Sequence, residues 1–373
     1  MKLLKLLNRF LLITLIGLMV SCHQLYWKHE KTILQENNNF IYIPDNFKVV
    51  SDSECVFISD FHTLYKYDLR NGKLLDFTVI DSVGFRQLLT TKIKYLPKRD
   101  YKFIWSEREA ESNNEKLYYF YSFDFDDSAY YVWAAFLSPY WGKYKNFKAY
   151  WMWKASILLM LDKDFTIKKS YYVTSYFKKI LPQYSGAGGF KIWKGKIYTY
   201  NAVFLNTKKV DKNYPVFSYI KFNKRGDVVN INNPQFIDSI YFIPNSFINF
   251  NNILHEWGNF KVFDGHLYAC SGSGIWRLDG KIKNMLQIDT AYHIEKFDIL
   301  SPTRFTYVYM PQNQRKTRDY YMVWHNNGDT MTKHIRYDTE RFKVRDISVY
   351  KNHFYFLVED TNCFYIDHHE LDI

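Results

Sequence analysis

The sequence predicts an all-β fold built from repeated units of four short strands, and three observations lead to this expectation. Tyrosine, phenylalanine and tryptophan supply 33, 31 and 10 of the 373 residues, and aromatic residues favour β-strands. Glycine and proline are sparse, with 15 and 9 residues, which argues against a disordered chain. A similar order of strands and turns recurs along the chain, and its clearest copy covers residues 260–280.

That copy contains a hairpin followed by a third strand. Val262 and Phe263 lead into Asp264-Gly265, a dipeptide that accepts the positive φ angles of a two-residue hairpin turn. Residues 266–270 form the return strand, and residues 275–278 form the third strand after a Ser-Gly-Ser-Gly loop. Short strands bounded by such turn residues are typical of an antiparallel sheet.

The first strand of this unit recurs along the chain with the same mix of apolar and aromatic residues. The last copy has strands at 347–350, 353–358 and 363–366 but lacks a fourth, whereas residues 40–43 form an isolated strand near the N-terminus. We therefore expect the N-terminal strand to complete the last unit. The copies begin near Phe47, Tyr101, Phe190, Phe260, Phe297 and Asp346.

Self-similar units of this size resemble the blades of a β-propeller, in which each sheet packs against its neighbours around a ring. The sequence thus predicts an all-β, six-bladed β-propeller over residues 40–373, closed by an N-terminal strand. Two stacked β-sandwich domains would have similar strands. They should be joined by a linker, and the chain has no Pro/Ser/Gly-rich break after Pro44.

The second copy is irregular, because 89 residues separate Tyr101 from Phe190. Its four strands are predicted at 101–105, 117–123, 157–161 and 165–173. This leaves an insertion near 126–154, or alternatively the core of a seventh blade.

The N-terminus has the order of a secretory signal peptide over residues 1–21. Lys2, Lys5 and Arg9 precede an apolar run over residues 10–20. The run is about half of the roughly 20 residues that a membrane-spanning helix needs. Export is therefore favoured over a permanent transmembrane segment.

The residues Met19-Val20-Ser21-Cys22 resemble the lipobox of bacterial lipoproteins, with Met19 where leucine is usual. This resemblance implies a lipid on Cys22, a lipidated tether over residues 22–39, and anchoring in the cell envelope. The outer membrane of a Gram-negative bacterium is the predicted location, with periplasmic and surface exposure both open.

Charge and cysteine content bear on the binding partners, disulfide bonds and metals to be expected. The formal net charge is +12, but the lysines are spread along the chain, so we interpret them as a solvated surface and expect no nucleic acid partner. Cys55, Cys270 and Cys363 are too few to staple the chain and are predicted to be mainly small buried side chains. No cofactor and no metal are predicted, and the pair His368-His369 is expected at a frayed end.

Blade order separates two faces. The loops that join the second strand of a blade to its third, and the fourth strand to the next blade, all emerge on one face of the disc. We expect a binding site on that face. On this face, the sequence places a base, a carboxylate and an aromatic platform side by side: His255, Glu256 and Trp257. Alternatively, Trp257 packs in the ring and the other two side chains are solvated. Further residues sorted to this face are His62 beside Asp60, Tyr184, His293, Arg315 and Arg318.

The most aromatic segment, residues 140–153, is the predicted exposed binding surface. Tyr150, Trp151 and Trp153 lie there among lysines, and aromatic faces with lysines suit sugars and acidic groups. These three side chains cannot all point to one side of a strand, so part of the segment is expected to be core.

The fold together with the lipobox resembles the uncharacterised six-bladed propeller lipoproteins of Gram-negative bacteria. The absence of a catalytic motif from the sequence favours a non-catalytic binding or scaffold lipoprotein, which engages an envelope protein or glycan through one propeller face. The alternative is a propeller hydrolase or lyase that acts on a carbohydrate or lactone with His255, Glu256 and His62. Because fold does not imply function, catalysis stays open at this point.

Overall fold

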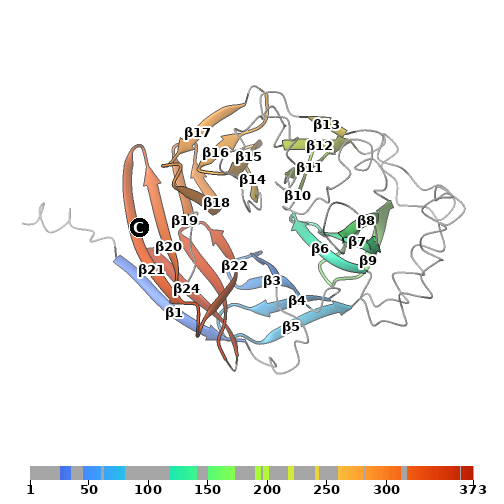
Figure 1. The fold of residues 1–373 in the computed structure, drawn as a ribbon, viewed down its shortest axis with the longest axis horizontal. Coiled ribbons are helices and arrows are strands. Elements are labelled where there is room, and N and C mark those ends of the chain that lie inside the picture. Colours follow the sequence, from blue (N-terminus) through green and yellow to red (C-terminus); the bar gives the residue numbers. More distant parts are fainter. Residues whose placement is uncertain are drawn as a thin grey trace, which may run out of the picture.

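The computed structural model shows a β-propeller architecture in which four-stranded antiparallel sheets surround a central axis (Figure 1). The described residues form six such sheets, and no helix among them is long and apolar enough to span a membrane. The structure describes residues 26–34, 45–59, 63–79, 118–140, 150–172, 190–194, 196–200, 217–221, 240–242, 259–280, 282–311, 317–361 and 363–372.

Five sheets are each made from four strands that follow one another in the chain. The first two sheets are β2 (Asp45–Val49), β3 (Glu54–Ser59), β4 (Thr63–Asp68), β5 (Leu74–Val79), and β6 (Tyr118–Phe125), β7 (Tyr130–Tyr140), β8 (Tyr150–Leu161), β9 (Ile167–Tyr172). The third and fourth are β10 (Phe190–Trp193), β11 (Lys196–Tyr200), β12 (Phe217–Lys221), β13 (Ile240–Phe242), and β14 (Asn259–Phe263), β15 (His266–Ser271), β16 (Gly274–Arg277), β17 (Lys283–Gln287). The fifth is β18 (Tyr292–Ser301), β19 (Arg304–Pro311), β20 (Thr317–Asn326), β21 (Asp329–Asp338).

The β14–β17 sheet confirms the unit predicted at residues 260–280. Phe263 pairs with His266 across the turn, and Asp264 and Gly265 have φ angles of 46° and 68°. Both angles lie in the left-handed region that a tight two-residue hairpin turn requires, which explains the Asp-Gly dipeptide.

The sixth sheet is closed by an N-terminal strand, as predicted, but by a different one. Strand β1 (Tyr26–Ile33) pairs antiparallel with β24 (Phe364–Asp372) along its length, from Tyr26 opposite Asp372 to Ile33 opposite Tyr365. The sheet order is β1-β24-β23-β22, with β22 (Lys343–Tyr350) and β23 (His353–Glu359). β1 therefore supplies the outermost strand of this closing sheet.

The predicted tether is consequently wrong over residues 26–33, and the predicted strand at 40–43 lies outside the described residues. Most side chains of β1 are exposed, and Ile33 is 62% exposed. An outermost strand needs few apolar residues, so its polar composition looked like a linker.

The insertion predicted near 126–154 is wrong in the described part of that range. β7 and β8 pair with each other as the two middle strands of the β6–β9 sheet. Asp126 accepts the backbone N–H groups of Ser128 and Ala129 at 2.8 and 2.9 Å and so forms the first hairpin turn. The segment predicted as the second strand is therefore the first, and residues 101–105 lie outside the described residues.

Apolar side chains fill the spaces between neighbouring sheets. One cluster joins the closing sheet to the β2–β5 sheet through Phe57 and Leu357, which are both fully buried. Another joins the closing sheet to the β18–β21 sheet through Met322 and Phe356. This face-to-face packing around a ring is how a propeller buries both sides of each sheet.

Cys55, Cys270 and Cys363, the cysteines that the structure describes, form no disulfide bond with one another. Cys55 and Cys270 are buried, which confirms the prediction for these two, while Cys363 is partly exposed. Burial raises the pKa of the Cys55 thiol well above its usual value, so this thiol is inert.

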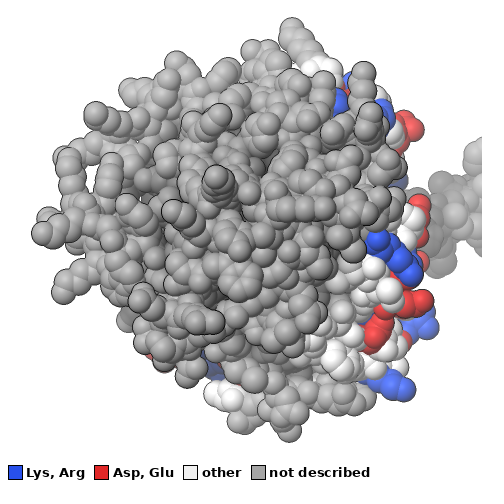
Figure 2. All heavy atoms as spheres, turned by 90° about the vertical axis from the view of Figure 1, so that its right-hand side faces the viewer, with Lys and Arg blue, Asp and Glu red and all other residues white. Residues whose placement is uncertain are grey.

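Described basic and acidic side chains are interspersed along one margin of the surface shown in Figure 2. Such mixing is typical of a solvated face. A different group of charged side chains lies near the axis of the ring and is described below.

Candidate functional site

In each sheet, the strand that lies closest to the axis (Figure 1) carries a charged residue there. The side chains come from β2, β6, β10, β14, β18 and β22, and we call them the axial ring. Its members are Lys48, Asp124, Lys191, Lys261, Lys296, Asp298 and Asp346.

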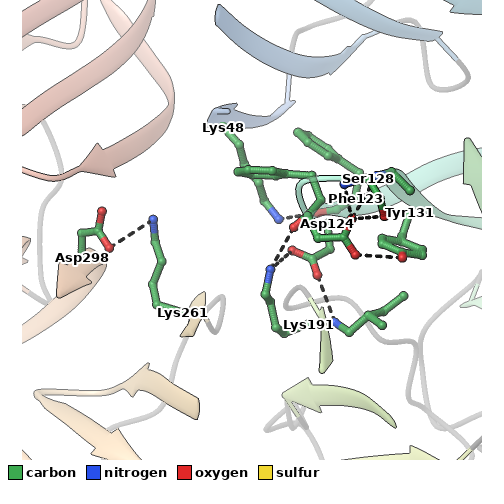
Figure 3. A network of polar contacts seen from close by, with 12 residues as sticks. Lys48, Phe123, Asp124, Ser128, Tyr131, Lys191, Lys261 and Asp298 are labelled. Atoms are coloured by element: carbon green, nitrogen blue, oxygen red, sulfur yellow. Dashed lines mark hydrogen bonds and ion pairs between the residues drawn. The ribbon is translucent and has the colours of Figure 1, made fainter. Parts of the chain in front are cut away.

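Three lysine–aspartate pairs of the axial ring cross from one sheet to the next, and Figure 3 shows two of them, Lys191–Asp124 and Lys261–Asp298. The Lys191 Nζ–Asp124 Oδ1 distance is 2.8 Å. Lys296 Nζ lies 2.9 Å from Asp346 Oδ1, and Lys261 Nζ lies 3.6 Å from Asp298 Oδ1. All six side chains are less than 30% exposed, and Asp124 is only 5% exposed, so water screens these pairs less than surface pairs.

Each aspartate also accepts a backbone N–H from the following sheet. Asp124 Oδ2 accepts from Ile192 N at 3.0 Å. Asp346 Oδ2 accepts from Phe47 N at 2.7 Å, and Asp298 Oδ2 accepts from Lys351 N at 2.8 Å. Charge-assisted bonds of this kind are stronger than neutral ones, so the three carboxylates hold neighbouring sheets together.

Lys48 is the fourth lysine of the axial ring and has a different environment. Its ammonium donates to the Phe123 carbonyl oxygen and lies 4.9 Å from the centroid of the Phe123 ring. Among the described residues, no carboxylate lies within ion-pair distance of it. Burial lowers the pKa of Lys48 from 10.5 to about 8; the charge of Asp124 opposes this, and those of the other three axial lysines add to it.

The axial ring therefore has a surplus of positive charge. Its four lysines stand against three aspartates, and the lowered pKa of Lys48 reports that its positive charge is incompletely compensated. An anion placed beside Lys48 would offset this cost, since an opposite charge nearby favours the protonated amine. This arrangement suits a carboxylate or phosphate group.

The axial ring is not on the face where the sequence led us to look. Asp124 is the penultimate residue of β6, next to the first hairpin turn of its sheet. Asp298 bonds to Lys351 in the turn between β22 and β23. These residues lie towards the opposite face, where the first hairpin turns of the sheets emerge.

Most residues predicted for the site lie outside the described residues: His62, Tyr184, His255, Glu256, Trp257, Arg315, and the lipidation residue Cys22. Tyr150, Trp151 and Trp153 lie in β8, opposite Tyr140, Pro139 and Leu137 of β7. Their backbone is therefore part of the sheet, and their role as a binding surface stays a prediction.

Two residues sorted to the predicted face, His293 and Arg318, act on one carboxylate. His293 Nε2 lies 2.6 Å from Glu295 Oε1. Burial raises the pKa of Glu295, but the bond to His293 and the charges of His293, Lys296 and Arg318 outweigh it and hold the pKa below its usual range. This carboxylate is ionised and already paired, which suits a structural role.

A sequence signal for the axial ring exists and was missed. In five of the six strands nearest the axis, a buried phenylalanine directly precedes an axial residue. In the sixth strand, β22, Arg345 precedes Asp346. Each charged side chain thus occupies one repeat position beside a core residue. The five pairs are Phe47-Lys48, Phe123-Asp124, Phe190-Lys191, Phe260-Lys261 and Phe297-Asp298.

No family model matches this chain, and no curated protein matches it. It is similar to the crystal structure of a member of the DUF4221 family from Bacteroides vulgatus, with a TM-score of 0.54 and 8% identity over 94% of this chain and 98% of that one. BamB from Moraxella catarrhalis has a TM-score of 0.35 and 9% identity over 92% and 98% of the two chains. YCF48 bound to D1 peptide has a TM-score of 0.39 and 9% identity over 92% and 96%.

At such identities a likeness shows the fold alone, and of these three only the first has a TM-score above 0.5. The chain is thus an all-β propeller with a structural neighbour in the DUF4221 family. The axial ring is defined from the residues of this chain alone.

Proposed function

We propose that this chain is a non-catalytic binding lipoprotein of the cell envelope, whose axial lysines receive an anionic group of its partner. The observation that carries the proposal is the positive surplus on the axis, with Lys48 as its least compensated member. In this proposal the six sheets are six blades of one ring that β1 closes.

The described chemistry supports binding over catalysis. The axial aspartates already accept a lysine ammonium on one oxygen and a backbone N–H on the other. Because both oxygens are already engaged, these carboxylates are poorly placed to accept a proton from a substrate. The alternative hydrolase or lyase depends on His62, His255 and Glu256, which lie outside the described residues.

The partner is an envelope protein or glycan that presents a carboxylate or phosphate to the axis. Ammonium groups bind such anions as point charges. A bound anion should raise the pKa of Lys48 from about 8, because a nearby negative charge favours the protonated amine that burial disfavours.

The test compares two lysine variants. Lys48→Met removes the axial charge and keeps much of the side-chain volume. The control, Lys66→Met, changes a lysine that also bonds to a backbone carbonyl, Lys163 O at 2.7 Å, and lies 4.8 Å from the Phe165 ring centroid, but belongs to β4.

The probes are arrays of acidic and neutral glycans and a set of acidic peptides. We expect binding to acidic probes to fall by at least about tenfold in Lys48→Met, corresponding to about 1.4 kcal/mol, and to be unchanged in Lys66→Met. Equal binding by both variants, or equal binding of acidic and neutral probes, would overturn the axial assignment.

The envelope location is a separate part of the proposal and rests on the lipobox-like residues 19–22. Cys22→Ala should abolish incorporation of labelled fatty acid and release the chain from the membrane fraction. Fractionation of inner and outer membranes then locates the wild-type chain. Unchanged labelling of Cys22→Ala would contradict the lipid anchor.

A further inference from the structure

A second polar cluster lies where the two ends of the chain meet. His29 comes from β1, whereas Asp367 and His369 come from β24, and we call these three the seam cluster. His29 and His369 are directly opposite partners across the two strands. Asp367 precedes His369 by two residues, so both side chains project from the same side of β24.

The three side chains converge. Asp367 Oδ1 lies 2.5 Å from His29 Nε2 and 3.6 Å from His369 Nε2. One possible ligand atom from each residue lies within 4.8 Å of the others. The two imidazole rings are stacked, with an interplanar angle of 7° and centroids 4.4 Å apart, and the Nε2 atoms of both rings lie beside the same carboxylate oxygen.

The surroundings orient Asp367. Tyr337 of β21 donates its hydroxyl hydrogen to Asp367 Oδ2, which leaves Oδ1 directed at the imidazoles. Hydrogen bonds of this kind commonly orient metal-binding side chains.

The Nε2 nitrogen of His369 is a second observation that points to this cluster. His369 is 3% exposed, and its Nε2 is buried without a hydrogen-bond partner. A buried polar atom without a partner is costly and demands an explanation. This atom faces Asp367 Oδ1 and lies within the cluster.

We propose that the seam cluster binds a divalent transition-metal ion, with Zn²⁺ as the best fit, through His29 Nε2, Asp367 Oδ1 and His369 Nε2. Two imidazoles and one carboxylate are a common three-ligand set for zinc, and the fourth tetrahedral position would be taken by water or a ligand. Calcium and magnesium prefer all-oxygen sets. The side chain of His29 is 45% exposed and provides the entrance.

Metal binding here would tie the N-terminal strand to the C-terminal strand. Backbone pairing already joins β1 to β24, and the Lys31 ammonium lies 4.8 Å from the centroid of the Tyr365 ring. A metal bound by residues of both strands would stabilise the closed state by mass action, because the opened chain holds only part of the site. The proposal does not depend on the axial ring.

Lys333 competes with the metal. Its Nζ lies 3.2 Å from His369 Nδ1. A metal on Nε2 leaves the imidazole proton on Nδ1, so two donors would then face each other, and the ammonium must move away or lose its proton. Binding also displaces any proton held between His29 and Asp367, so it should release protons and weaken in acid.

The test uses the full chain after chelator treatment. Zinc is titrated by calorimetry, Co²⁺ is used as a spectroscopic probe of tetrahedral ligation, and thermal unfolding is followed with and without Zn²⁺. We expect one Zn²⁺ per chain, a tetrahedral cobalt spectrum, and a higher unfolding temperature in zinc.

Two variants remove ligands from the site. His29→Ala changes the most exposed ligand, and Asp367→Asn keeps the shape of its side chain. Each should lower zinc affinity by at least about 100-fold, since losing even an orienting outer contact costs 10–100-fold. Lys333→Met should tighten zinc binding several-fold.

His266→Ala is the matched control. His266 Nδ1 lies 2.5 Å from Asp279 Oδ2, and its side chain is 37% exposed, so it forms a similar histidine–aspartate pair without the third residue. This variant should bind zinc like the wild type. No zinc uptake by the wild type, or equal uptake by His29→Ala, would overturn the proposal; circular dichroism of His29→Ala excludes loss of the fold as the cause.

Discussion

The closing sheet and the β14–β17 sheet have the same four-stranded order but are assembled differently. In the β14–β17 sheet, the outermost strand follows its neighbour after a short turn in the same stretch of chain. In the closing sheet, the outermost strand β1 pairs with β24, whose residues are more than 300 positions away. Closing so long a loop costs conformational entropy that the short turn avoids.

Contacts at the C-terminal end of β1 offset this entropy cost in the closing sheet. Thr32 Oγ1 donates to Leu69 O of the next sheet at 3.0 Å, and Leu34 N donates to Phe364 O at 3.1 Å. Gly72, in the turn between β4 and β5, packs against the backbone of Ile33. At this seam, noncovalent contacts therefore replace the missing chain connection. Three predictions test these contacts, and a fourth tests the axial Lys48.

The largest effect is expected from removing β1. Deletion of residues 1–33 exposes the edge of β24, including the buried residues Tyr365 and Ile366. An unpaired edge of this kind promotes association. We expect loss of cooperative thermal unfolding and the appearance of oligomers in sedimentation velocity, whereas deletion of residues 1–25 should leave a folded monomer. Wild-type unfolding after loss of β1 would show that the ring needs no closure.

A smaller effect is expected from Gly72→Ala. The added Cβ would lie 2.0 Å from Ile33 O, and Gly72 has a φ of +66°. The control Gly265→Ala has a similar φ of +68° but nothing within 4 Å, so it isolates the backbone cost. In urea unfolding we expect a loss of about 3 kcal/mol for Gly72→Ala and about 1 kcal/mol for Gly265→Ala. Equal losses would mean that β1 does not pack against this turn.

Asp346→Asn should weaken the contacts that the closing sheet makes near the axis with its two neighbouring sheets. Asp346 binds the Lys296 ammonium and the Phe47 backbone N–H, so the variant weakens two charge-assisted contacts between sheets. We expect a loss of about 2 kcal/mol in urea unfolding. Asp279→Asn, which changes an aspartate that binds His266 and Arg277 within the β14–β17 sheet, should cost less than about 1 kcal/mol.

The smallest effect, of opposite sign, is expected for Lys48→Met. The pKa of Lys48 is about 8 in the folded chain and 10.5 ordinarily, so between these values the unfolded chain binds more protons. Wild-type stability should therefore rise as the pH increases from about 8 to 10.5, and the variant should lack this rise. At pH 7 the variant should be more stable by about 1 kcal/mol, because lost packing offsets part of the shift.

This last comparison is made by urea unfolding at pH 7 and pH 10. If Lys48→Met destabilises the chain at pH 7, then Lys48 holds the ring together and does not await an anion. Affinity of the wild type for acidic probes should fall as the pH rises above about 8.

Sequence reasoning located most of the propeller because its signals are local. Asp264-Gly265 predicts a turn from the φ angles it tolerates, and the missing fourth strand after residue 366 predicts completion by the N-terminus. The same reasoning failed for β1, since an exposed outermost strand has the composition of a linker. It also failed for β7 and β8, because Asp126 was not recognised as a turn residue.

The two polar sites needed the tertiary structure. His368-His369 was expected at a frayed end, yet β1 covers β24 and buries His369 beside His29, a residue that is distant in the chain. The axial residues carried a weak repeat signal, but a lysine after a buried phenylalanine is as consistent with solvent exposure as with an axis.

Local residue patterns were enough to predict the all-β class, the repeated four-stranded unit and the use of an N-terminal strand to complete the last one. These follow from backbone preferences and from alternation along single strands, which act over a few residues. Only the tertiary structure decided which strand closes the ring, which charges meet on the axis and which histidines meet at the seam. Those outcomes depend on Coulomb interactions and burial between residues that only the closed ring brings within a few ångströms.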